Sequence, residues 1–132
     1  MMQTLITKAQ ALLNPMTLSS PHMSAATVAC VLLAANGKIY EGVCIHLSCG
    51  LGFCAEAAAV ANMIKDGETV IQQIVAVSDD AILSPCGRCR EMMVQVSVKN
   101  FETEVIISPS FPWYCCEILA RIEPSLGRHE LS

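Results

Sequence analysis

Residues 27–45 read TVACVLLAANGKIYEGVCI, and this stretch decides how the sheet of the protein begins. Residues 27–35 form an apolar run that is typical of a buried strand. Asn36-Gly37 is the strongest short-range signal for a hairpin, and residues 38–45 follow as a second strand. We therefore predict an antiparallel hairpin at this point of the chain.

Helices and strands alternate around this hairpin. Apolar residues at helical spacing, each series ended by a turn or breaker signal, predict four helices over residues 4–13, 54–65, 86–98 and 113–122. Two further apolar runs, at residues 71–77 and 104–107, predict strands, and residues 14–24, which contain two prolines, predict a surface connection.

This order of elements favours an α/β protein. Alternating strands and helices predict a largely parallel central sheet with helices on both faces, opened by the antiparallel hairpin. A length of 132 residues suits one domain, and the sequence contains neither an internal repeat nor a composition break. We expect a single domain over residues 1–132.

The amino-acid composition indicates which kinds of partner the protein binds. The formal net charge is −4, with 8 Lys and Arg against 12 Asp and Glu, which argues against a nucleic-acid polymer and favours a small-molecule ligand. Charged residues make up 15%, below the roughly 25% usual for soluble domains, so we expect apolar surface between subunits. The apolar runs are shorter than the roughly 20 residues that span a bilayer, and the N-terminus lacks a charged leader; we expect a cytoplasmic protein without a membrane partner.

Two cysteine motifs stand at the predicted starts of two helices: CAE at residues 54–56 and PCGRC at residues 85–89. In a reducing compartment, cysteines at tight spacing more often hold a metal than form disulfides. Cys86 and Cys89 are one helical turn apart, so both sulfurs can face one point, and Cys54 can approach from the neighbouring helix. Three thiolates and a water form the open tetrahedral arrangement of a catalytic Zn²⁺.

Glu56 is close enough to the predicted metal site to act on its water. Zinc lowers the pKa of a bound water from about 16 to about 7, and a neighbouring carboxylate can carry the released proton to a substrate nitrogen. The combination of Cys-x-Glu with a later Pro-Cys-x-x-Cys is the signature of zinc deaminases that act on bases. The two motifs therefore predict a hydrolytic deaminase.

With the hairpin sequence NGKIY at residues 36–40, these motifs resemble the cytidine deaminase superfamily over residues 4–124. The resemblance is to the small three-cysteine branch that contains cytidine deaminases and blasticidin S deaminases. It implies a three-layer α/β/α fold with a central mixed sheet and hydrolytic release of an exocyclic amine as ammonia. It also implies a homotetramer, with a dimer as the alternative, in which neighbouring subunits contribute to each active site.

The resemblance also implies roles for individual residues. Glu56 would protonate the ring nitrogen and then the leaving amine, and backbone groups would hold the edge of the base. The implied zinc ligands are Cys54, Cys86 and Cys89, and the implied base-holding residues are Ala55 and Ser84.

The sequence departs from cytidine deaminases where the sugar binds. Those enzymes carry Gly-x-Asn-x-Glu-Asn after the hairpin, with the Asn and Glu holding the ribose hydroxyls, whereas this chain has Cys44 and His46. A thiol cannot replace the paired donor and acceptor of an amide, and an imidazole cannot replace a carboxylate. Ala26 stands where an aromatic residue usually stacks near the base. We expect Cys44 and His46 to contact the substrate, and cytidine not to be preferred.

A second departure concerns charge near the metal. Ala57 stands where cytidine deaminases place an arginine, and three thiolates on Zn²⁺ leave a net charge of −1. We expect Arg90 to balance this charge, with Arg88 as the second candidate. The blasticidin branch lacks the same arginine, which favours the comparison with that branch.

The main hypothesis is a zinc-dependent hydrolytic deaminase for a small aminated pyrimidine: a cytidine-like nucleoside, a free base or a nucleoside antibiotic such as blasticidin S. The alternatives are a zinc-binding but catalytically silent deaminase-like scaffold, and a dithiol redox protein that uses Cys86 and Cys89. The remaining cysteines are expected in the core or at an interface, because a free cysteine packs as a small apolar residue. They are Cys30, Cys44, Cys49, Cys115 and Cys116.

Overall fold

The computed structural model describes residues 1–110 and 112–114. Its elements, in chain order, are α1 (Met2–Leu12), β1 (Met16–Thr17), β2 (Ser24–Ala34), β3 (Ile39–His46), the 3-10 helix η1 (Ser48–Gly50), α2 (Ala55–Lys65), β4 (Ile71–Val77), β5 (Ile82–Leu83), α3 (Gly87–Val96), the 3-10 helix η2 (Val98–Glu102), β6 (Glu104–Ile106) and β7 (Pro112–Tyr114).

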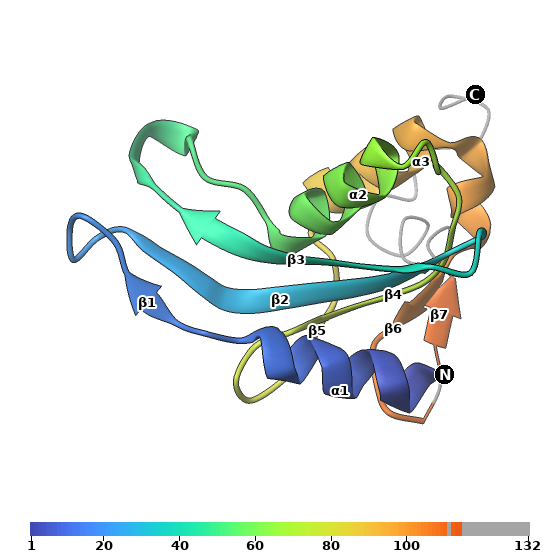
Figure 1. Cartoon of the computed structure of the whole chain (residues 1–132), viewed down its shortest axis with the longest axis horizontal. Helices are drawn as coiled ribbons and strands as arrows, with labels where there is room; N and C mark the ends of the chain where they lie inside the picture. The colour runs from blue at the N-terminus through green and yellow to red at the C-terminus, as the bar shows by residue number, and fades with distance from the viewer. Residues whose placement is uncertain (111, 115–132) are drawn as a thin grey trace.

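The described elements form three layers. A seven-stranded mixed sheet separates α1 on one face from α2 and α3 on the other, which confirms the predicted fold class (Figure 1). Side chains of β4 alternate between the two faces, as a strand requires. Ile74 and Ala76 pack in the core beneath α2 and α3, whereas Val75 and Val77 pack in the core beneath α1. The strand is buried on both faces because helices cover both.

The sheet contains less parallel pairing than the sequence pattern predicts. β2 pairs antiparallel with β3 and with β4, and among the described strands only β4 and β6 pair in parallel. The prediction of a largely parallel sheet is therefore wrong. The reason is that β3, α2 and β4 form a crossover that skips one position: β2 lies between the two strands that run in the same direction.

The predicted hairpin is confirmed. β2 and β3 pair from Leu33 with Ile39 onward, and Gly37 occupies the turn with a φ of 84°. Further along β3, Gly42 allows α2 to lie against the strand. A Cβ at this position would approach Ala58 Cβ to 2.7 Å and Ala55 O to 2.8 Å. This close contact determines how far from the sheet α2 begins.

Two short strands lie where other structure was predicted. β1 falls in the predicted connection of residues 14–24 and pairs with the start of β2. β7 contains Trp113, which pairs with Val105 of β6, so the predicted helix does not begin at residue 113; residues 115–122 lie outside the described part of the chain. Both strands form hairpins with the strand next to them in the chain, and at two and three residues they are too short to show the alternation of apolar and polar residues that predicts a strand. Within the described residues, none of the helices has the length and apolarity needed to cross a membrane.

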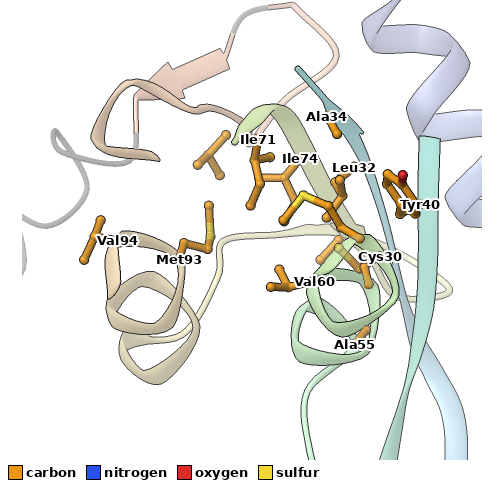
Figure 2. Packing of buried hydrophobic residues seen from close by; sticks show 14 of the residues in the cluster. Cys30, Leu32, Ala34, Tyr40, Ala55, Val60, Ile71, Ile74, Met93 and Val94 are labelled. Carbon is orange, nitrogen blue, oxygen red and sulfur yellow. The ribbon is translucent and has the colours of Figure 1, made fainter. Parts of the chain in front are cut away.

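A buried asparagine joins α3 to the core shown in Figure 2, where Met93 of α3 lies on the side of the helix toward Ile71 and Ile74 of β4. Asn100 is completely buried. Its Oδ1 accepts a hydrogen bond from the Ile71 N–H at 2.8 Å, and its Nδ2 donates to the carbonyls of Thr69 and Met93 at 3.0 and 2.8 Å. All of its hydrogen-bonding groups are therefore used within the chain.

Candidate metal and active site

Two helices begin at the cysteine motifs, as predicted. Cys54 is the N-cap residue of α2 and Cys86 is the N-cap residue of α3, both with extended backbone. Their carbonyls accept the first helical hydrogen bonds, from Ala57 and Arg90. The first N–H groups of a helix have no partner within it and favour negative charge nearby. Both helix starts therefore favour thiolates at this point of the molecule.

The three motif cysteines form a cluster. The Sγ atoms of Cys54, Cys86 and Cys89 all lie within 4.8 Å of one another, and Cys54 and Cys86 are separated by 3.7 Å. All three are free thiols. A tetrahedral Zn²⁺ with Zn–S bonds of about 2.3 Å separates its sulfurs by about 3.8 Å. The type and spacing of the donor atoms therefore fit Zn²⁺.

The three thiols differ in how readily they ionise within the chain. Burial, followed by the charge of Glu56, raises the pKa of the Cys89 thiol, and burial also raises the pKa of Cys54. Burial also opposes ionisation of Cys86, but hydrogen bonds from the Cys89 backbone N–H and from the Cys89 and Cys54 thiols outweigh it and lower its pKa. A divalent cation would stabilise all three thiolates, which is a second observation that fits a metal site.

Glu56 lies in the first turn of α2 and is 5% exposed. Burial raises the pKa of its carboxyl group, while hydrogen bonds from its own backbone N–H and from the Cys89 thiol oppose this rise. The bond to Cys89 directs the carboxylate toward the sulfur cluster. A carboxyl group with a raised pKa beside a metal-type site has the properties of a general acid and base.

A pocket of about 160 Å³ opens in front of Glu56 and the cluster. A cavity of about 150 Å³ holds one benzene molecule, so this pocket has the size of a single six-membered ring. It brings together seven of the residues predicted for the site. The lining residues are Val28, Cys44, His46, Cys54, Ala55, Glu56, Ala76, Leu83, Ser84 and Cys86.

Three apolar residues of the pocket were not predicted: Val28 from β2, Ala76 from β4 and Leu83 from β5. Each is an ordinary strand residue with no chemical signal in the sequence. Ala26, by contrast, does not line the pocket. It is 3% exposed at the irregular part of β2 between Ala25 and Ala29, with a φ of 58°. From β2, Val28 is the side chain that reaches the pocket.

The two predicted charge-balancing arginines have different surroundings. Arg90 is 3% exposed within α3 and is not among the residues that line the pocket. Arg88 is exposed and lines a second hollow of about 270 Å³, together with Cys54 and His46. Arg88 therefore shares a surface with a cluster cysteine, and the assignment of either arginine to the charge of a bound metal stays a prediction.

The other described cysteines differ from one another. Cys30 and Cys44 are buried, as expected for core residues. Cys49 is exposed in η1, so its expected place in the core is wrong, and an interface role for it stays a prediction. Cys115 and Cys116 lie outside the described residues.

A three-layer α/β fold with three clustered thiols at two helix starts, and a buried carboxyl group beside them, defines a zinc-enzyme class. Residues 2–104 match the family model for the cytidine and deoxycytidylate deaminase zinc-binding region. The chain belongs to this family. This membership supports a hydrolytic deaminase with zinc, and it favours a metal site over a dithiol redox pair, which would not require Cys54.

Solved structures of cytidine deaminases share the fold. The enzyme from Mycobacterium tuberculosis is 24% identical, with a TM-score of 0.72 over 89% of this chain and 92% of its own. The enzyme from Mycobacterium leprae is 21% identical, with a TM-score of 0.72 over 89% and 95% of the two chains. The enzyme from Bacillus anthracis is 18% identical, with a TM-score of 0.71 over 98% and 94%.

Proposed function

We propose that this protein is a zinc-dependent hydrolytic deaminase of a small aminated pyrimidine. The reaction adds water to the ring carbon that carries the amine, breaks the C–N bond, and gives a ring carbonyl and ammonia. The observation that carries the proposal is Glu56: its buried carboxyl group is hydrogen-bonded to Cys89 and lines a ring-sized pocket beside the sulfur cluster.

In this proposal Cys54, Cys86 and Cys89 hold Zn²⁺, which would supply activation of the water nucleophile. Glu56 takes one proton of the attacking water and transfers it to the ring nitrogen. It then takes the second proton, from the new hydroxyl on the ring carbon, and transfers it to the amine as the C–N bond breaks. Burial of Glu56 supports this role, because a carboxyl group with a raised pKa both accepts and returns a proton readily. Release of the amine as ammonia leaves the carboxylate ready for another cycle.

The pocket walls orient the ring. Backbone groups of Ala55 and Ser84 would hold the polar edge of the base, and Cys44 and His46 would face the side that carries the ring substituent. The apolar side chains of Val28, Ala76 and Leu83 would exclude water molecules other than the reacting one. Exclusion of bulk water supports the proposal that the reaction takes place in this pocket.

Arg90 would balance the charge of the metal cluster from within α3, in place of the missing arginine at Ala57, with Arg88 as the second candidate. Arg88 and Cys54 line the same hollow, which supports a role for Arg88. A lysine at position 88 keeps the charge but loses the planar guanidinium, so Arg88→Lys should retain more zinc than Arg88→Ala.

Assembly as a homotetramer, or as a dimer, is part of the proposal, as is a cytoplasmic location. Leu47, Leu51 and Phe53 support an assembly, because they are 37%, 72% and 37% exposed on one loop beside the pocket. Sedimentation equilibrium of the purified protein tests this part: a monomer at every concentration would contradict it.

The experiment that tests the function is zinc analysis of the purified protein, together with ammonia release from cytosine, cytidine, deoxycytidine, guanine-type bases and blasticidin S. We expect about one zinc per chain and ammonia from at least one aminated pyrimidine. Bound zinc without ammonia from any compound would instead support the silent scaffold. Absence of zinc under reducing conditions would support the alternative of a dithiol redox protein that uses Cys86 and Cys89.

A further inference from the structure

We infer that this site selects its substrate by the aminated ring and makes no paired hydrogen bonds to the hydroxyls of a ribose. The substrate class is then an aminated pyrimidine that is free or carries a substituent without a vicinal diol. This inference rests on the proposed function and concerns the substrate of the same site.

The hydrogen-bonding groups of the pocket carry the first step. Within the described part of the chain, Glu56 is the only carboxylate that lines the pocket, and no side-chain amide lines it. Glu56 is already engaged by its own backbone N–H and by the Cys89 thiol. A vicinal diol needs two acceptors or donors in a fixed pair, which carboxylates and amides provide. The described pocket has none left for a sugar.

Cys44 already has a hydrogen-bond partner within the protein. It is 2% exposed on β3, and its Sγ lies 3.3 Å from the Thr27 Oγ1 of β2, at hydrogen-bond distance for sulfur. Its weak polar capacity is therefore satisfied within the protein. A buried group that already has its partner gains nothing from a ligand hydroxyl. This part of the wall behaves as an apolar surface toward the substrate.

A hollow beside the pocket, also lined by His46, can receive the ring substituent. His46 is exposed and lines both the ring pocket and the hollow of about 270 Å³, so the two spaces are adjacent. Most of the hollow is apolar, with Ile45, Leu47 and Phe53 in its walls, and its charged lining residue is Arg88, which the proposed function assigns to the metal cluster. An imidazole offers a single donor or acceptor on each nitrogen, not a matched pair. The hollow has room for a ring substituent but places no requirement for a diol on it.

The expected selectivity follows from this arrangement. A site built to hydrogen-bond a substrate hydroxyl rejects an analogue that lacks it by about 10⁴–10⁵-fold. A hydrophobic wall discriminates between groups of similar size by only about 10–200-fold. For this protein, kcat/KM for cytidine and for 2′,3′-dideoxycytidine should therefore agree within about tenfold.

The experiment measures kcat/KM by ammonia release for cytidine, 2′-deoxycytidine, 2′,3′-dideoxycytidine and 1-methylcytosine with the zinc-loaded protein. We expect the dideoxy and methyl compounds to be substrates within about tenfold of cytidine. A preference of more than about 100-fold for cytidine over its dideoxy analogue overturns the inference and leaves the proposed function intact. Absence of ammonia from all four compounds and from blasticidin S overturns both.

A substitution at Cys44 tests whether the β3 wall of the pocket faces the ring substituent. Cys44→Asn introduces an amide at the β3 wall and should raise the ratio of kcat/KM for cytidine over 2′,3′-dideoxycytidine by about tenfold or more. Cys49→Asn makes the same exchange at an exposed position outside the pocket and should leave the ratio unchanged. An unchanged ratio in a folded Cys44→Asn protein overturns the assignment of this wall to the substituent. If the variant does not fold, the substrate series with the unaltered protein still decides the inference.

Discussion

The two ends of α3 bury polar groups in different ways. Near its C-terminal end, Asn100 is fully buried and makes three hydrogen bonds, while Thr103 donates to the Ile71 carbonyl at 2.8 Å. At its N-terminal end, where α3 meets the first turn of α2, Glu56 of α2 is also buried, but burial raises the pKa of its carboxyl group, and the sulfurs beside it lie close together. Asn100 is fully satisfied by the chain, whereas the cysteine cluster would be stabilised by an added cation.

This difference separates structural from functional polarity. A buried polar group that has all its partners rigidifies the fold and stabilises it. A buried group whose charged form the protein disfavours is characteristic of a functional site, where a metal or substrate supplies the missing partner. Substitutions at the N-terminal end of α3 should therefore change activity and metal content, and those at the C-terminal end should change stability.

The largest effect is expected for Glu56→Gln. The amide preserves the size of the side chain but cannot carry a proton, and general acid and base catalysis contributes about 10²–10⁴-fold to a rate. We expect kcat to fall by at least this factor, measured by ammonia release, while the zinc content stays at the level of the unaltered protein. A variant that keeps its activity would show that another group transfers the proton.

Cys89→Ser should act mainly on the metal. A hydroxyl is a poor ligand for Zn²⁺ compared with a thiolate, and metal bound at a thousand times its dissociation constant stabilises a fold by about 4 kcal/mol. We expect loss of zinc in elemental analysis and a lower melting temperature, which added zinc does not restore. Cys30→Ser is the control, because Cys30 is buried outside the cluster: it should retain the metal even if it lowers stability.

Asn100→Ala should destabilise the fold through the loss of hydrogen bonds near the C-terminal end of α3. It removes three hydrogen bonds and leaves the Ile71 N–H and two carbonyls without this partner, at a cost of roughly 2–4 kcal/mol in the free energy of unfolding. Urea denaturation measures this loss, and the partly exposed Asn62 of α2 provides a control substitution. The folded variant should retain zinc and kcat; loss of either at unchanged stability would contradict the separation of the two ends.

The smallest effect is expected for Glu68→Gln, before β4. Glu68 accepts hydrogen bonds from the backbone N–H groups of Val70 and Thr69, at 3.0 and 2.8 Å, and these bonds lower the pKa of its carboxyl group. A lowered pKa in the folded state gives a stabilisation that is present above the ordinary carboxyl pKa and is lost as the pH falls through the lowered value.

The measurement for Glu68 is the difference in melting temperature between the two proteins as a function of pH. The unaltered protein should melt slightly higher at neutral pH, and the difference should disappear in acid. Glu41→Gln, at another exposed carboxylate on β3, is the control for the loss of one negative charge from the surface. A difference that grows in acid would contradict the assigned hydrogen bonds.

The sequence predicted the parts of the molecule that have local signals. The Asn36-Gly37 turn determines a hairpin from two residues, and the cysteine motifs mark the starts of α2 and α3 within one residue. It did not predict that β4 lies beside β2 instead of β3, because a crossover helix of the same length can serve either arrangement.

The residues of the candidate site also fall into those that the sequence predicted and those that it did not. Cysteines and a glutamate at fixed spacing carry a chemical signal, so the residue types and their spacing were enough to predict the cluster and Glu56. Val28, Ala76 and Leu83 are apolar strand residues that contact the pocket only because three strands meet there. Ala26 was expected near the base, but it is buried at the irregular part of β2 instead.

Gly42 has a consequence for how this protein can change over generations. Any larger residue there would push against Ala55 and Ala58 and tilt the start of α2, which would disturb the catalytic machinery as a whole. Two residues further along the same strand, Cys44 lines the pocket, so a change there alters the space for the substrate. Nearby sites on one strand thus differ in evolvability: one preserves the reaction, and the other is open to the acquisition of new substrates.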